Sequence, residues 1–341
     1  MKNVSLGAII KTFLPLAIGV YLVWLFFSGM SEEHILSFKR ALKEANYFYI
    51  FISLILAWVA LYSRAERWKY VLEPLGYTSS WKHRYHAVMI GYLVNFTIPR
   101  SGEPTRSLML QRSDNIPFSK SFGTIIAERA VDLIMLASIC GITFLIGYDD
   151  LMTILTKVKD ELGSTDAENP SSMGWIKYAV IAVIALGVII IAMIPTLRQK
   201  FIDFVKDVMK GVLAIFKSKN PWAFIGHTFL IWGCYVVEFI IPFYCWEETS
   251  TIPLSGMMIA FVAGSIGITF TNGGIGAYPL LVGLVVAFYL HAFPQTEAEG
   301  IGKALGMIVW TAQTILMVVL GLISLVLLPK NYKTDAGINK N

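Results

Sequence analysis

NFTIPRSGE (residues 95–103) and TNGGIGAYP (residues 271–279) each interrupt a run of apolar residues, at matching places in the two halves of the chain. Non-helical backbone survives inside a bilayer only where protein or water satisfies its polar groups. Two such interruptions in corresponding positions are typical of transport sites built from broken helices. The first interruption also carries charge, from Arg100, Glu103 and the nearby Arg106. The two segments therefore predict a polar site inside a membrane protein.

The composition agrees with a membrane-embedded chain. Of the 341 residues, 56% are hydrophobic and 15% are charged, and the mean hydropathy is +0.63, whereas soluble domains are roughly a quarter charged. Two pairs of apolar segments flank the interruptions and are shorter than the ~20 residues of a full span, which favours re-entrant hairpins over ten simple, glycine-kinked helices. The predicted spans are 12–29, 47–62, 121–147, 174–194, 221–245 and 301–328, and the predicted hairpins are 85–98 with 104–118 and 254–270 with 279–293.

The two halves have the same order of elements: a span, an amphipathic segment (30–46 or 197–219), a second span, a broken hairpin and a third span. The first span runs outward in one half and inward in the other, so the halves form an inverted repeat. We therefore expect an all-α polytopic fold. Its parts are a first repeat (1–147), an external acidic loop (148–173), a second, inverted repeat (174–328) and a cytoplasmic tail (329–341).

Basic residues orient this topology, because Lys and Arg resist translocation. Most of the 28 Lys and Arg residues fall in the termini and in the segments 64–84, 100–120 and 198–219, which predicts that both termini are cytoplasmic. Arg64 and Arg67 are counted here as loop residues after a span that ends at 62. The net charge of +5 is explained by orientation, without nucleic acid. No small-residue cleavage site follows the span 12–29, so we expect a retained anchor, not a signal peptide.

Charged side chains continue into the apolar span that follows the first interruption, as Glu128, Arg129 and Asp132. Each intramembrane charge costs roughly 2.5–3.5 kcal/mol on insertion scales, so such groups persist when paired or when they line a hydrated cavity. One interpretation is an ion cluster that fixes this helix against the loop of Arg100 and Arg106. The other is an anion site, in which those two arginines are forked donors suited to phosphate. Glu103, Glu128 and Asp132 then orient the arginines or bind a coupling proton or cation.

Backbone groups add to the predicted site. The sequence SGEP (101–104) is typical of a helix start, and a helix N-terminus within the membrane attracts anions. The second interruption offers backbone amides in the same way, although glycines also let helices pack closely. Glu238 is either a coupling residue or a neutral, hydrogen-bonded group near the outer interface. The predicted substrate-binding residues are Asn95, Arg100, Glu103, Arg106, Glu128, Arg129, Asp132, Asn272, Gly273, Gly274, Gly276 and Tyr278.

Motifs of catalysis are not found in the sequence. It contains no HExxH, GxSxG or P-loop pattern, and Cys140, Cys234 and Cys245 lack metal-ligand spacing. We therefore expect no catalytic residue, metal or cofactor.

Several motifs together resemble the lysylphosphatidylglycerol synthase transmembrane-region family. They are Arg64-x-x-Arg67-Trp68, Asn95-x-x-x-Pro99-x-x-x-Glu103-x-x-Arg106, Glu128-Arg129-x-x-Asp132 and Asn272-Gly-Gly-Ile-Gly-Ala277, and the resemblance covers about 12–328. The family includes the flippase half of the bacterial multiple peptide resistance factor. The resemblance implies a multi-pass protein of the bacterial inner membrane that moves or binds phospholipid-like molecules. It does not imply lipid aminoacylation, which belongs to a soluble C-terminal domain in two-part members.

The leading hypothesis is a lipid flippase or transporter that holds a phosphate-bearing headgroup between the two hairpins. One alternative is a membrane-embedded lipid or polyprenyl-phosphate transferase. A second alternative is a lipid-binding or assembly protein that does not transport. The expected partner is a membrane phospholipid or another phosphate-bearing lipid, and a homo-oligomer is compatible with the sequence.

Overall fold

The computed structural model describes residues 32–163, 219–271 and 273–328, with 21, 24, 199, 206 and 216 as isolated residues. Within these ranges the regular structure is helical and no strand is present. Some predicted parts lie wholly or nearly wholly outside them: the spans 12–29 and 174–194, the segment 197–219, Asn272 and the tail 329–341.

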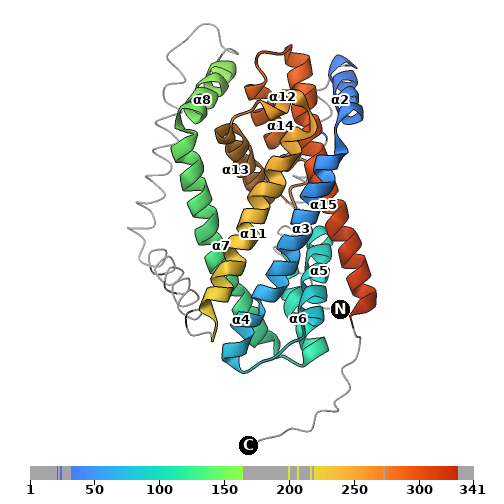
Figure 1. The fold of residues 1–341 in the computed structure, drawn as a ribbon, viewed down its shortest axis with the longest axis vertical. Helices are drawn as coiled ribbons and strands as arrows, with labels where there is room; N and C mark the ends of the chain where they lie inside the picture. Colours follow the sequence, from blue (N-terminus) through green and yellow to red (C-terminus); the bar gives the residue numbers. More distant parts are fainter. Residues whose placement is uncertain are drawn as a thin grey trace, which may run out of the picture.

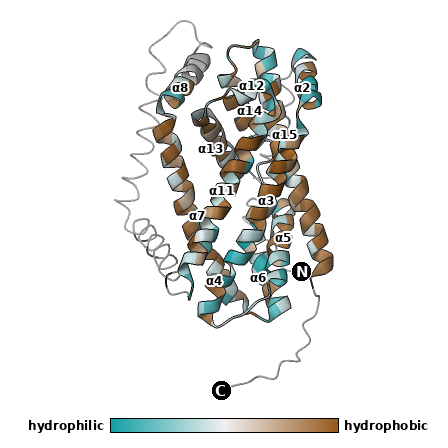
Figure 2. Cartoon of the chain, in the orientation of Figure 1, coloured by the Kyte–Doolittle hydropathy of each residue, from teal (hydrophilic) through white to brown (hydrophobic). Residues whose placement is uncertain are grey.

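Four helices among the described residues are long and apolar enough to cross a membrane: Tyr47–Leu75, Phe118–Ile146, Pro221–Cys245 and Gln295–Leu327. Figure 2 shows hydrophobic residues along the middle of these helices and hydrophilic residues towards both ends of the molecule. The elements, labelled as in Figure 1, are α2 (Glu32–Glu44), α3 (Tyr47–Arg67), α4 (Lys69–Leu72), η1 (Glu73–Leu75), α5 (Trp81–Thr97), α6 (Gly102–Asp114), α7 (Phe118–Ile146), α8 (Tyr148–Gly163), α11 (Pro221–Ile240), η2 (Ile241–Cys245), α12 (Glu247–Ser250), α13 (Leu254–Phe270), α14 (Ala277–Tyr289) and α15 (Gln295–Leu327).

The first interruption separates α5 from α6. Ile98 has extended backbone, with φ −125° and ψ 108°, as expected for a residue before proline. Arg100 has a φ of 60°, a left-handed conformation that reverses the chain and that non-glycine residues rarely adopt. Helix α6 then begins at Gly102, with Pro104 in its first turn. The predicted helix break and helix start are both present.

The second interruption separates α13 from α14 and is built on glycine. Gly273, Gly274 and Gly276 have φ values of 64°, 81° and 72°. Only a residue without Cβ adopts such angles at little cost, which explains three glycines in four positions. The indole Nε1–H of Trp310 in α15 donates to the carbonyl oxygen of Gly273 at 2.9 Å. A polar backbone group at the break is thereby satisfied inside the bundle.

Each interruption turns the chain back, so that α5 packs on α6 and α13 packs on α14. The first hairpin lies towards the lower end of the long helices in Figure 1, and the second lies towards the upper end. Helix α15 contacts both hairpins. Its Gly302 and Gly306 lie against Gly283 and Pro279 of α14, and its Gly321 lies against Leu93 of α5.

Two boundaries differ from the sequence prediction. The prediction that the second span ends at 62 is wrong, because α3 continues to Arg67 and buries both Arg64 and Arg67. Hydropathy ends a span where charge appears, but these charges are paired inside the bundle. The segment expected as an external loop, 148–173, begins with helix α8.

We expect Gly306→Ala to lower thermal stability, because the added Cβ would lie 2.6 Å from the carbonyl oxygen of Pro279. Overpacking of this kind costs about 1–3 kcal/mol. Gly141→Ala in α7 is the matched control, since its Cβ would meet no atom of the described residues within 4 Å. The measurement is the unfolding midpoint of each variant in one detergent. Equal midpoints for the two variants would contradict the close packing of α14 on α15.

Candidate functional site

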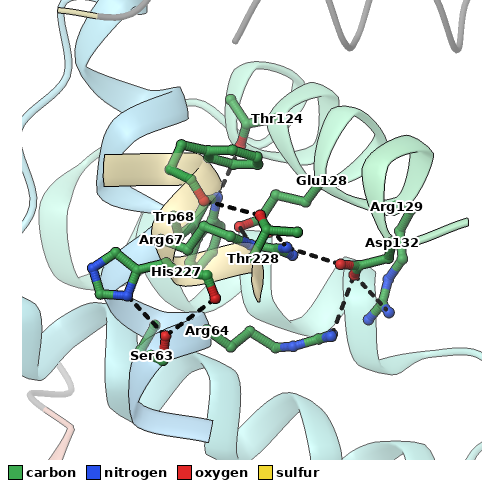
Figure 3. Close-up of polar contacts among 12 residues, drawn as sticks. Ser63, Arg64, Arg67, Trp68, Thr124, Glu128, Arg129, Asp132, His227 and Thr228 are labelled. Carbon is green, nitrogen blue, oxygen red and sulfur yellow. Dashed lines mark hydrogen bonds and ion pairs between the residues drawn. The ribbon is translucent and has the colours of Figure 1, made fainter. Parts of the chain in front are cut away.

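A cluster of buried charges joins α3, α6 and α7. Glu128 and Asp132 lie four residues apart on one face of α7, and α3 directs Arg64 and Arg67 towards them. The Oδ1 atom of Asp132 accepts a hydrogen bond from Arg67 Nη1 at 2.8 Å, and its Oδ2 accepts one from Arg64 Nη2 at 3.2 Å. Trp232 Nε1–H also points to Asp132 Oδ1, at 3.4 Å. Figure 3 shows Asp132 as a centre on which several guanidinium groups converge.

Glu128 forms the inner part of the cluster. Its carboxylate lies 3.5 Å from Arg67 Nε and 3.1 Å from Arg106 Nη2 of α6. Aromatic rings cover these guanidinium groups, since Arg106 lies 4.2 Å from the centroid of the Trp68 ring. Removing one partner of a buried ion pair typically costs about 3–5 kcal/mol. The ion pairs of Glu128 with Arg67 and Arg106 therefore hold α3, α6 and α7 together at this cluster.

The outer part of the cluster is more accessible. Arg129 Nη2 lies 2.9 Å from Glu103 Oε1, and the two side chains are 42% and 33% exposed. Arg129 Nη1 also lies 3.6 Å from Asp132. An accessible pair of this kind contributes little to stability, so its groups are available to exchange partners.

The cluster has a surplus of positive charge. Four guanidinium groups (Arg64, Arg67, Arg106 and Arg129) meet three carboxylates (Glu103, Glu128 and Asp132) in these ion pairs. A surplus cation in a low-dielectric interior is costly unless an anion or water reaches it. The electrostatics thus favour an anionic ligand.

A cavity of about 460 Å³ opens beside this cluster and its surplus positive charge. Its volume lies within the range typical of small-molecule sites. It reaches the first residue of α6, Gly102, where the N-terminal end of the helix adds a favourable field for anions. The charged residues that line it are Arg64, Glu103, Arg106, Arg129 and Asp132.

Two hydrogen-bond donors on residues that line this cavity are unpaired. The Nε–H groups of Arg64 and Arg106 are buried and have no hydrogen-bond partner in the structure. Buried polar groups are nearly always paired, so each unpaired one calls for an explanation. Guanidinium groups match phosphate oxygens in number and geometry. Two unpaired donors beside a cavity with surplus positive charge are suited to a phosphate group.

A second cavity of about 310 Å³ adjoins the first and reaches the second hairpin. The two share six lining residues, among them Asn95, Trp232 and Tyr235, so they are neighbouring parts of one internal space. Aromatic side chains form much of the second wall, and Glu238 is its acidic residue. Glu238 is 6% exposed and accepts a hydrogen bond from Gln313 Nε2 at 3.4 Å.

The structure brings together most of the predicted site residues. Asn95, Glu103, Arg106, Arg129 and Asp132 line the first cavity, and Asn95, Glu238, Gly273 and Tyr278 line the second. Glu128 is buried behind the first cavity, and Gly274 and Gly276 form the turn of the second hairpin. Arg100 is exposed and lines neither cavity. Asn272 lies outside the described residues.

Among the residues of the first cavity that sequence reasoning missed are Arg64, Trp232 and Tyr235. Arg64 had a usable signal, since it lies three residues before Arg67 at the end of an apolar run. Trp232 and Tyr235 carry no local signal, because aromatic residues are common in apolar helices. Among the described residues, no group of three or more His, Cys, Asp or Glu could hold a metal ion.

Comparison with known proteins gives one family and several distant relatives. A family model described as lysylphosphatidylglycerol synthase TM region matches residues 12–321. A protein of Haloferax volcanii named glycosyltransferase AglD is 25% identical over 71% of this chain and 43% of its own length. A UPF0104 membrane protein of Methanocaldococcus jannaschii is 28% identical over 32% of this chain and 33% of its own length. This chain thus spans less than half the length of both.

Another UPF0104 membrane protein, from Pyrococcus horikoshii, is similar over most of its length. It is 21% identical over 76% of this chain and 84% of its own length. No solved structure matches the chain.

We expect Asp132→Asn to destabilise the fold by about 3–5 kcal/mol, because Arg64 and Arg67 both lose a buried carboxylate. Asp149→Asn makes the same chemical change at an exposed position in α8 and serves as the control. The readout is the unfolding midpoint in detergent. If the unfolding midpoints of both variants equal that of the unmodified protein, Asp132 does not organise the cluster.

Proposed function

Because the chain belongs to the lysylphosphatidylglycerol synthase transmembrane-region family, we propose that it is a flippase or transporter for a phosphate-bearing membrane lipid. In this proposal the phosphate binds in the first cavity, and the acyl or prenyl chains stay in the bilayer. The observation that carries the proposal is the pair of unpaired donors on Arg64 and Arg106, beside a cavity with surplus positive charge. Such a wall is complementary to phosphate oxygens.

The membrane topology in the proposal is an inverted repeat. The first hairpin enters from the cytoplasmic side and the second enters from the opposite side, with both termini in the cytoplasm. The positions of the two hairpins at opposite ends of the long helices support this arrangement. A continuous internal space between the two helix breaks also supports it, since inverted-repeat transporters bind substrate where their halves meet.

Alternating access then requires ion pairs that can exchange partners. The half-exposed pair of Arg129 and Glu103 is suited to this role, because it is accessible and its arginine also reaches Asp132. Phosphate replaces Glu103 on Arg129 when the lipid enters, and Glu103 returns when the lipid leaves. The inner pairs of Glu128 stay closed and keep the helices in register.

The relatives named above come from archaea, so we place the protein in a cytoplasmic membrane and make no bacterial assignment. The sequence-based expectation of a bacterial inner membrane rested on the resemblance alone.

Reconstitution in liposomes tests transport. Vesicles that contain the purified protein and fluorescent phosphate-bearing lipids are expected to exchange those lipids between leaflets faster than protein-free vesicles. Failure to accelerate any such lipid, anionic or zwitterionic, would overturn the transport proposal. Binding without exchange would instead favour a lipid-binding or assembly protein.

We expect Arg129→Gln to reduce lipid exchange at least tenfold, because the phosphate loses a charged donor at the accessible wall of the cavity. Arg100→Gln is the matched control, since Arg100 is exposed and lines neither cavity. Initial exchange rates are compared at equal protein density in the vesicles. A larger loss in the Arg100 variant than in the Arg129 variant would contradict the assignment of the phosphate to this cavity.

A second candidate function is lipid-linked group transfer, because one relative is named a glycosyltransferase. The assay for it incubates the protein with a prenyl-phosphate sugar and a lipid acceptor, and mass spectrometry detects the product. A glycosylated product that forms with the protein and not in a protein-free control would favour the transferase over the flippase.

A further inference from the structure

The second cavity differs from the first in the kind of hydrogen-bonding group that it leaves unpaired. In the first cavity the unpaired buried atoms on the arginines are donors, the Nε–H groups of Arg64 and Arg106. Among the residues of the second cavity they are oxygen atoms: Oε2 of Glu238, which lines this cavity alone, and Oδ1 of Asn95, which lines both. The other oxygen of Glu238 already accepts from Gln313. The second cavity therefore calls for a ligand that supplies hydrogen-bond donors.

Much of the wall of this cavity is aromatic, and its aromatic side chains come from five helices, α5, α11, α13, α14 and α15. Phe96, Trp232, Tyr235, Phe239, Phe261 and Trp310 line it. Trp310 is fixed by its hydrogen bond to Gly273, and Phe239 packs edge-on against Phe261 with ring centroids 5.5 Å apart. Rigid aromatic faces with a few placed polar groups are typical of sites that orient a ring-shaped ligand.

The charge of the lining residues distinguishes among donor ligands. No Lys or Arg is among the residues that line the second cavity, and Glu238 is the acidic one. An ammonium group would satisfy Glu238, but it would also lie in the same internal space as the surplus guanidinium charge. A hydroxyl group carries no charge and both donates and accepts. It therefore suits Glu238 and either end of the Asn95 amide.

We propose that the second cavity binds the hydroxylated part of the lipid headgroup, a sugar or polyol ring attached to the phosphate. This inference rests on the proposed function, because the phosphate in the first cavity sets the position of the ring. Asn95 lines both cavities and lies where the two parts of the headgroup join. The substrate class is thus a lipid phosphate that carries a sugar or polyol.

Equilibrium binding to the purified full chain in detergent tests the proposal with three probes. They are a prenyl monophosphate, the same prenyl phosphate carrying a hexose, and phosphatidylethanolamine. We expect the hexose-bearing probe to bind about tenfold more tightly than the bare phosphate, as for one or two added hydrogen bonds. Glu238→Gln keeps the shape of the side chain but weakens the acceptor, so the ratio of the two affinities should fall towards one.

Glu247→Gln is the matched control, because Glu247 is exposed in α12 and lines neither cavity. It should keep the full ratio. Phe261→Leu is a second variant, in case Glu238→Gln fails to fold. It removes one aromatic face and should also lower the ratio.

The binding results distinguish a failure of the sugar assignment from a failure of the proposed function. Equal binding of the two prenyl probes by the unmodified protein would overturn the sugar assignment and leave the phosphate site intact. Tighter binding of phosphatidylethanolamine than of the hexose-bearing probe would assign the second cavity to an ammonium group instead. Binding of none of the three would overturn the proposed function together with this inference.

Discussion

The buried ion network of Glu128 and Asp132 with the arginines of α3 and α6 is the constraint on which the rest of the structure depends. Charges inside an apolar bundle must be paired, so α3, α6 and α7 are held where guanidinium and carboxylate groups meet at 2.8–3.5 Å. The pairing is not one to one. The surplus arginine charge faces a cavity, and a structural cluster thereby becomes a candidate anion site.

The two broken hairpins border the internal space beside this network. Helices that end inside the bundle leave polar backbone groups, which glycine turns and the Trp310 side chain satisfy locally. The space between the breaks is then available for a ligand. Its two parts differ in their unpaired groups: Arg64 and Arg106 in the first part carry unpaired donors, and Glu238 in the second part carries an unpaired oxygen. A ligand with hydrogen-bond acceptors at one end and donors at the other is complementary to both parts.

Much of the local structure was predictable, because its causes are local. Pro99 disfavours helix at the residue before it, and three glycines in four positions favour a turn, so both breaks could be located from sequence. Span ends were harder to predict. Hydropathy ended α3 at 62, whereas ion pairs to residues more than sixty positions away allow the helix to continue to Arg67. Pairing with a distant residue also places Arg64 in the wall of the cavity, whereas Arg100 is exposed.

By itself, the sequence determined an apolar helical chain, two interruptions of those helices and a charged α7, since hydropathy, glycine, proline and charge act through neighbouring residues. Only the tertiary structure decided which charges pair, which donors stay unpaired and which aromatic residues form the cavity walls. These outcomes depend on contacts between helices that lie far apart in the chain, such as α3 with α11 and α5 with α15, and on the ion pairs between α3 and α7. Periodicity within one helix carries no information about the face that another helix presents to it.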